Sequence, residues 1–145
     1  MKPEIISPFF CFLPVLLVAF DLSSSFSWIP YRFRTHYVRI VSNFTDENIE
    51  YHCKSEDDDL GQRILQPKKE WELSFKINFW GTTRFYCYFW YQNFNASFDV
   101  FDADVDVDLD CGGDHCIWTA QKDGFYLLQI KRNENVKKYD WTEEI

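Results

Sequence analysis

The sequence has few residues of the kinds that mark collagen-like, disordered or membrane-embedded chains. Only 5 of its 145 residues are glycine and 5 are proline, too few for a collagen-like or low-complexity chain. After the first twenty residues no apolar run is long enough to span a membrane, which takes about 20 residues. Aromatic residues, in contrast, make up 20% of the chain, which indicates a packed core in a chain of single-domain length.

Positive charge is also scarce in this chain. The 15 lysine and arginine residues are outnumbered by 23 aspartate and glutamate residues, which gives a formal net charge of −8. Because such a surface repels a phosphate backbone, we expect no nucleic-acid partner. The charge either attracts a basic protein surface or serves only to keep an aromatic-rich protein soluble.

The N-terminal segment predicts secretion. Lys2 precedes an apolar run over residues 5–20, and a serine-rich stretch follows at 23–27. This order is typical of a secretory signal peptide, which we place at residues 1–25, with a single mature domain at 26–145. The alternative is an uncleaved membrane anchor, but the run is short and contains two prolines. We therefore expect a secreted protein that is not inserted in a membrane once the signal is removed.

The cysteines support an oxidising compartment. Four remain after removal of the signal: Cys53, Cys87, Cys111 and Cys116. An even number in a secreted chain predicts two disulfides, but four cysteines allow three pairings and the sequence does not choose among them. A zinc site is the alternative, since His115 lies beside Cys116. A second clustered pair of ligands is missing, so we predict neither a metal nor a cofactor.

Short alternating segments predict an all-β fold. The clearest is residues 71–79, whose alternation would point Trp71, Leu73, Phe75, Ile77 and Phe79 inward. The other expected strands cover residues 37–41, 49–54, 84–91, 97–101, 116–120 and 125–130.

These segments together define the expected architecture. Residues 84–91 are apolar on both faces, as expected for a central strand, and residues 122–124 form a good hairpin turn. About seven strands without an amphipathic helix predict a small antiparallel β-sandwich, stabilised by disulfides. The charged segment 131–138 is expected to be a frayed tail.

Four segments, in order along the chain, carry a family resemblance. They are residues 52–61, 71–82, 85–90 and 111–126. In these segments the sequence resembles the plant self-incompatibility S-protein homologues, which are typified by the stigma determinant of poppy. The resemblance implies a disulfide-bonded β-sandwich that acts outside the cell as a signalling ligand for a membrane receptor. It implies no catalytic residues.

Two acidic segments are candidates for binding a partner. Their residues are Glu56, Asp57, Asp58 and Asp59 in the first and Asp104, Asp106 and Asp108 in the second. The first segment is either a recognition loop for a basic surface or a turn that aspartates favour locally. The second lies in the stretch 102–110, which would align five carboxylates on one face if extended. Calcium or a basic partner would neutralise such a row, or the row is a solvated edge strand.

The remaining motifs indicate a glycoprotein without enzyme chemistry. Sequons for N-linked glycosylation begin at Asn43 and Asn95. The three histidines, His36, His52 and His115, do not form the motifs of a secreted T2-type ribonuclease, and no nucleophile–base pattern stands out.

We therefore predict a secreted ligand that binds a cell-surface receptor through its loops. The contributing loops are residues 43–48, 56–66, 92–96 and 102–115. The alternative is a calcium- or carbohydrate-binding protein of the cell wall. Its site would be the carboxylates of 102–110 or exposed aromatic residues.

Overall fold

The computed structural model describes residue 30 and residues 33–145. The predicted signal peptide at 1–25 and the start of the mature chain lie outside the described residues. The described part contains one short helix and ten strands: β1 (Thr35–Ser42), β2 (Ile49–Lys54), β3 (Asp59–Leu65), β4 (Glu70–Lys76), β5 (Arg84–Tyr91), β6 (Phe94–Asp102), α2 (Val107–Asp110), β7 (His115–Gln121), β8 (Gly124–Gln129), β9 (Glu134–Tyr139) and β10 (Thr142–Glu143).

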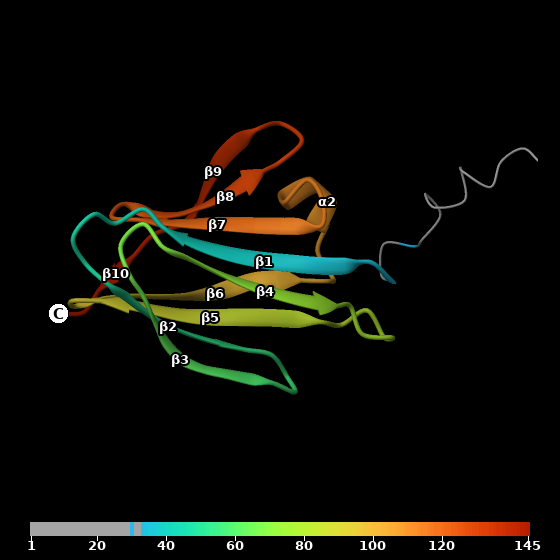
Figure 1. Cartoon of the computed structure of the whole chain (residues 1–145), viewed down its shortest axis with the longest axis horizontal. Coiled ribbons are helices and arrows are strands. Elements are labelled where there is room, and N and C mark those ends of the chain that lie inside the picture. The colour runs from blue at the N-terminus through green and yellow to red at the C-terminus, as the bar shows by residue number, and fades with distance from the viewer. Residues whose placement is uncertain (1–29, 31–32) are drawn as a thin grey trace, which may run out of the picture. The chain divides into compact units, whose positions relative to one another are not determined.

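The strands form two five-stranded sheets that face each other (Figure 1). The first sheet has the order β4-β1-β7-β8-β9 and the second has the order β10-β6-β5-β2-β3. The predicted sandwich is confirmed, and β5 is the central strand of the second sheet, as expected. One pairing is not antiparallel: β1 and β7 run parallel, with Tyr37 opposite His115. The additional strands are β3, β9 and β10.

Alternation along each strand places the core between the sheets. In β1 every second residue is buried, and Val38 and Ile40 are fully inaccessible. Rings from both sheets meet in this core, where Phe89 of β5 lies 4.7 Å from Phe125 of β8. The indole Nε1 of Trp118 in β7 donates a hydrogen bond of 3.0 Å to the Val100 carbonyl of β6, so a buried polar contact also joins the two sheets.

The C-terminal segment is ordered, so the prediction of a frayed tail over 131–138 was wrong. The chain turns after β8 and adds β9 to the edge of the first sheet. The reason lies just beyond the charged residues, where two aromatic side chains pack against rings of the core. Tyr139 stacks on Phe98 with ring centroids 4.2 Å apart, and Trp141 lies 4.6 Å from Phe125.

The strand predicted at 71–79 is shorter than its alternation suggested. β4 ends at Lys76, so Trp71, Leu73 and Phe75 lie on the half-buried face of the strand. Phe79 was expected to point inward, but 76% of its surface is exposed. The prediction was wrong at this residue because the chain leaves the sheet before reaching it.

Two disulfides join the four cysteines and resolve the pairing. Cys53 of β2 and Cys87 of β5 are directly opposite each other in neighbouring strands, with Cα atoms 4.0 Å apart. Cys111 and Cys116 close the short segment that connects α2 to β7. All four cysteines are buried, so both bonds belong to the packed interior.

Candidate partner-binding surface

Three connecting segments meet at one end of the sandwich. The last residue of β2, Lys54, lies beside Tyr86 near the start of β5, and the last residue of β4, Lys76, lies opposite Thr35. The β2–β3 turn, the β4–β5 loop and the segment with α2 are therefore at the same end (Figure 1). The predicted loops at 43–48 and 92–96 are at the opposite end, since Glu50 pairs with Trp90 there. The four predicted loops thus fall into two separate groups.

The two broader loop predictions also need correction. Most of 56–66 is not a loop, because β3 begins at Asp59 and pairs with β2. At 92–96 the connection is a tight turn of Gln92 and Asn93, since β6 begins at Phe94. The side chains in both regions are consequently held by strand pairing.

The β4–β5 loop, residues 77–83, is fixed by hydrogen bonds within the loop. The Asn78 backbone N–H donates to Thr83 Oγ1 at 2.7 Å. The Asn78 side-chain oxygen accepts from the Thr82 N–H at 2.8 Å, and the Asn78 backbone carbonyl accepts from the Gly81 N–H at 3.0 Å. Gly81 has φ of 70°, a conformation that glycine adopts without strain. These contacts define one geometry for the residues in between.

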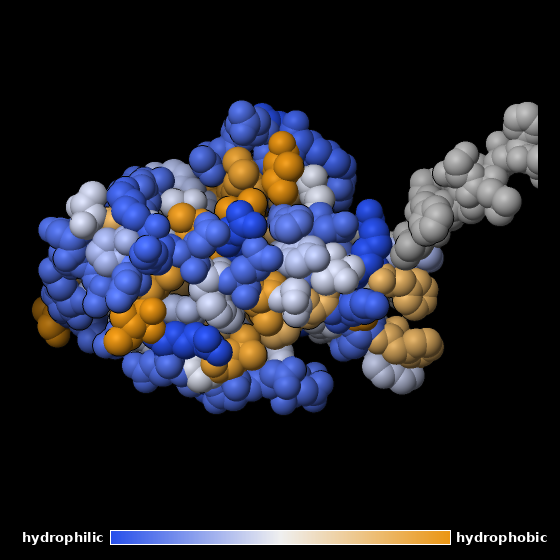
Figure 2. All heavy atoms as spheres, viewed as in Figure 1, coloured by the Kyte–Doolittle hydropathy of each residue, from blue (hydrophilic) through white to orange (hydrophobic). Residues whose placement is uncertain are grey.

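This loop presents two aromatic rings to solvent. Phe79 and Trp80 are 76% and 79% exposed, and their rings pack edge to face with centroids 5.2 Å apart. Figure 2 shows apolar atoms projecting from this end of the domain, over the β4–β5 loop. Large rings held so far from the core contribute nothing to it, and exposed apolar groups of this kind mark interaction sites. We call Phe79 and Trp80 the aromatic tip.

Sequence reasoning missed the aromatic tip, although a signal was present. Successive side chains of a strand point to opposite faces, so adjacent Phe79 and Trp80 cannot both point inward. The Gly81-Thr82-Thr83 turn follows directly. Two large aromatics immediately before a turn indicate that at least one ring is exposed.

The first acidic segment forms a closed turn across from this loop. The Ser55 N–H donates to the Asp58 carbonyl at 2.7 Å, and the Asp58 N–H donates to Ser55 Oγ at 3.1 Å. The turn leaves Glu56, Asp57 and Asp58 exposed. We call these three residues the acidic turn.

Asp59 has a structural position and does not belong to the acidic turn. Its carboxylate hydrogen-bonds the His52 ring and accepts the Gly61 N–H at 2.9 Å. These two hydrogen bonds, that of His52 first, lower the pKa of Asp59 below its ordinary value. Asp59 therefore fixes the start of β3.

A cleft of about 440 Å³ separates the acidic turn from the β4–β5 loop. The acidic turn lines one side, while Asn78, Thr82 and Thr83 line the other, with Phe75 and Phe85 among the remaining lining residues. Lys76 and Arg84 also border it, and Arg84 is held by Asp99 at 2.8 Å. The cleft thus combines the carboxylates of the acidic turn with apolar and neutral polar groups and the two cationic side chains Lys76 and Arg84.

The second acidic segment is not extended, so the predicted row of carboxylates was wrong. Residues 107–110 form α2, and the Asp106 side chain caps this helix by accepting the Leu109 N–H at 3.0 Å. The carboxylates consequently point to different partners. Asp108 pairs with Lys131 at 2.7 Å, and Asp110 pairs with Lys138 at 3.2 Å.

Of the three candidates in this segment, Asp104 is exposed at the end of the sandwich, where it extends the negative surface. Asp106 and Asp108 are also exposed but already bind the helix terminus and Lys131. Within residues 33–145, no cluster of three or more His, Cys, Asp or Glu side chains is arranged to hold a metal ion. The geometry on which the calcium alternative depended is therefore missing.

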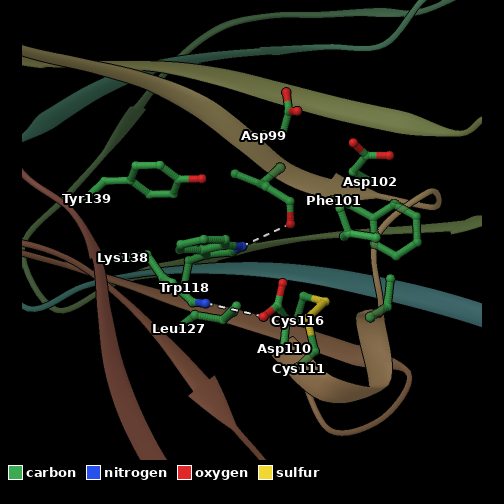
Figure 3. A pocket seen from close by; sticks show the side chains of 13 residues that line it. Asp99, Phe101, Asp102, Asp110, Cys111, Cys116, Trp118, Leu127, Lys138 and Tyr139 are labelled. Carbon is green, nitrogen blue, oxygen red and sulfur yellow. Dashed lines mark hydrogen bonds and ion pairs between the residues drawn. A yellow bond between two sulfur atoms is a disulfide. The ribbon is translucent and has the colours of Figure 1, made fainter.

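A second, smaller cavity of about 150 Å³ lies between the sheets beside α2 (Figure 3). Trp118, Leu127 and the Cys111–Cys116 disulfide line its floor, and Asp99, Asp102 and Asp110 are among the remaining lining residues. The Trp118 N–H and the Asp110 carboxylate already bind Val100 and Lys138. A volume of this size admits at most a small molecule.

The three histidines lie in different surroundings. His36 is fully buried next to Phe75 and Phe101, and His115 stacks on Tyr37 with centroids 4.3 Å apart. His52 pairs with Asp59. Both disulfides also remove the mature cysteines as nucleophiles.

The described residues thus form a two-sheet β-sandwich with two buried disulfides and an ordered, aromatic and acidic surface at one end. A family model described as "Plant self-incompatibility protein S1" matches residues 37–141. The chain therefore belongs to the plant self-incompatibility protein S1 family, which confirms the resemblance of the four sequence segments. This family is not a known enzyme family.

Relatives in Arabidopsis thaliana support the assignment. "S-protein homolog 2" is 37% identical over 123 residues, which cover 83% of this chain and 73% of the relative. "S-protein homolog 1" is 37% identical over 105 residues, which cover 72% of this chain and 70% of the relative. A solved structure of an SPH protein superposes with a TM-score of 0.56 at 19% identity, covering 77% of this chain and 97% of that one.

The solved relative is described as one of "a widespread family of small, highly stable, secreted proteins from plants". Secretion is thereby confirmed for the family to which this small plant protein belongs. In the described part of the chain, no helix has the length and apolar character of a transmembrane span.

The two sequons remain predictions of glycosylation. Asn43 is exposed after β1, where its side chain accepts a hydrogen bond of 2.6 Å from Lys68. Asn95 lies in β6 and donates to Glu144 at 2.9 Å.

Proposed function

We propose that this protein is an extracellular signalling ligand that binds a cell-surface protein through the aromatic tip and the acidic turn. The observation that carries the proposal is the pair of exposed rings on a hydrogen-bonded loop, 76% and 79% accessible. Membership of the self-incompatibility S1 family supports the ligand class. The absence of an enzyme role is part of the same proposal.

The chemistry of this end defines the partner surface. Aromatic side chains dominate binding energy at protein interfaces, particularly when they enter a pocket on the partner and are already ordered. The acidic turn adds negative charge across the cleft from the β4–β5 loop. The partner is therefore expected to offer an apolar pocket with a basic rim, since complementary charge accelerates association and sets its orientation.

Binding of the labelled secreted chain to intact plant cells tests the proposal. Replacing both Phe79 and Trp80 with alanine should weaken saturable binding by about 2 kcal/mol or more, the range of interface hot spots. Ile130→Ala is the control, because Ile130 is an exposed apolar residue in the turn between β8 and β9 and does not border the cleft. Equal binding by the double variant and the control would refute the role of the tip.

The acidic turn is tested separately by charge reversal. Lysine at Glu56, Asp57 and Asp58 should slow association and make it less dependent on salt. The single variant Asp57→Lys is matched in charge by the control Asp46→Lys at the opposite end of the sandwich, in the predicted loop 43–48. If Asp46→Lys lowered binding as much as the turn variant, a specific role of the acidic turn in receptor binding would be refuted.

A further inference from the structure

Three aromatic side chains form a ladder on the outer face of β5. Tyr86, Tyr88 and Trp90 alternate with residues that are buried in the core. The ring centroids of Tyr88 and Trp90 are 6.0 Å apart and their planes differ by only 15°. Tyr86 lies 5.8 Å from Tyr88 with its ring turned by 79°. We call these three residues the aromatic ladder.

The fold does not explain the aromatic ladder. The described residues form two sheets, and the core lies between them, so the outer face of β5 has no third layer to pack against. Tyr88 is 38% exposed. Apolar residues on both faces were expected for a central strand, but only the inner face meets another sheet. The outward rings therefore need another explanation.

Polar side chains flank the aromatic ladder on both neighbouring strands. On β2, the residues opposite the ladder are Glu50, His52 and Lys54. On β6, they are Asn95, Ser97 and Asp99. A row of rings is thus bordered on each side by hydrogen-bonding groups.

The charged side chains of this face have both signs, with an excess of carboxylates. Lys54 and Arg84 lie among Glu50, Asp59, Asp99 and Asp102, and Arg84 donates to Asp99 at 2.8 Å. The chain as a whole carries a formal charge of −8. This surface favours an uncharged ligand over an acidic one, because an anion is repelled by the carboxylates of this face and by the net charge of the whole chain.

Two shallow hollows extend along the aromatic ladder. One, of about 390 Å³, is bordered by Tyr86, Tyr88 and Ser97. The other, of about 240 Å³, is bordered by Trp90, Glu50 and Gln92. Together they suit an elongated ligand that lies along the strand.

We propose that the aromatic ladder binds a neutral polysaccharide of the plant cell wall. The C–H groups on one face of a pyranose ring carry partial positive charge and pack on the negative faces of Tyr88 and Trp90. The hydroxyl groups at the ring edge exchange hydrogen bonds with the polar side chains of β2 and β6. Tyr86 also lines the cleft beside the β4–β5 loop, but Tyr88 and Trp90 do not, so the wall contact and the receptor contact rest on adjoining surfaces with different aromatic residues.

The test measures retention of the secreted chain on neutral wall polysaccharides. The secreted chain with its disulfides is tested both as produced and after removal of N-linked glycans, because a glycan on Asn95 would lie beside Trp90. Insoluble cellulose and soluble xyloglucan and mannan are the probes, and polygalacturonate is the acidic control. We expect saturable binding to at least one neutral polymer and little to polygalacturonate.

Variants separate the ladder from the tip. Tyr88→Ala with Trp90→Ala should weaken polysaccharide binding about tenfold or more, while Tyr88→Phe, which keeps the ring, should retain most of it. The Phe79→Ala, Trp80→Ala protein should bind the polymer normally. Thermal unfolding confirms that each variant is folded. Binding to none of the neutral polymers, or equal binding by the ladder variant, would overturn the proposal without affecting the receptor proposal.

Discussion

The two disulfides should contribute unequally to stability, and the difference follows from their positions in the chain. Cys53 and Cys87 are separated by 34 residues, whereas Cys111 and Cys116 are separated by 5. A cross-link stabilises mainly by restricting the unfolded chain, and the restriction grows with the loop that it closes. The chain-entropy relation gives about 4 kcal/mol for the longer loop and about 2 kcal/mol for the shorter one.

The comparison between the two bonds is internally controlled. All four cysteines are at most 4% exposed, so replacing either pair with alanine removes two equally buried sulfur atoms. The loss of packing is then similar, and the difference between the variants reports loop closure. Urea unfolding of the two double-alanine proteins gives their free energies of unfolding. The two values are compared directly if both proteins show the same dependence of this free energy on urea concentration.

We expect the Cys53→Ala, Cys87→Ala protein to be less stable than the other variant by about 2 kcal/mol. An equal loss in the two proteins, or a larger loss on removing Cys111–Cys116, would refute the loop-closure argument. In that case the short bond would act by holding the connection between α2 and β7 in the folded state.

Two further predictions concern the stability of variants at Gly112 and Gly113 and the pKa of Asp59. Gly112→Ala should destabilise the protein by about 1–3 kcal/mol, because φ of Gly112 is 80° and a Cβ atom there would lie 2.6 Å from Gln129 Oε1. Gly113→Ala is the control, because a Cβ atom at Gly113 meets nothing within 4 Å. Equal stability of the two variants in thermal unfolding would contradict this prediction. An NMR titration should find the pKa of Asp59 below its ordinary value of 3.8. The His52 contact then stabilises the fold above that value and is lost as the pH falls through the lowered pKa. Asp59→Asn should therefore reduce the loss of stability at acidic pH, and an unchanged acid slope would argue against it.

Local alternation predicted the parts of the fold in which tertiary contacts agree with it. β2 and β5 follow the expected pattern, and their facing cysteines form a disulfide. The pairing could not be derived from spacing, because it depends on which strands become neighbours. The parallel contact between Tyr37 and His115 is likewise set by packing of distant segments.

The candidate site was only partly predictable, and the failures have local physical causes. Alternating aspartates suggested an extended strand at 102–110, but an Asp106 side chain that caps a helix competes successfully with strand formation. Alternation also extended the β4 strand to Phe79, although hydrogen bonds of Asn78 end it earlier. The acidic turn was correctly placed between two strands. Its exposure agrees both with a recognition loop and with a turn that aspartates favour locally.

The parallel pairing of β1 with β7 has a consequence for biosynthesis. The strands β2, β3, β5 and β6 are continuous neighbours within their sheet, so this half of the domain has its partners as soon as β6 has been translated. β1 is made first, yet one of its edges stays unpaired until β7 emerges near the end of translation. An open edge is a template for wrong pairing. We therefore expect the nascent chain to require chaperone protection of β1 in the secretory pathway, and to be released from it only when the last third of the sequence has been synthesised.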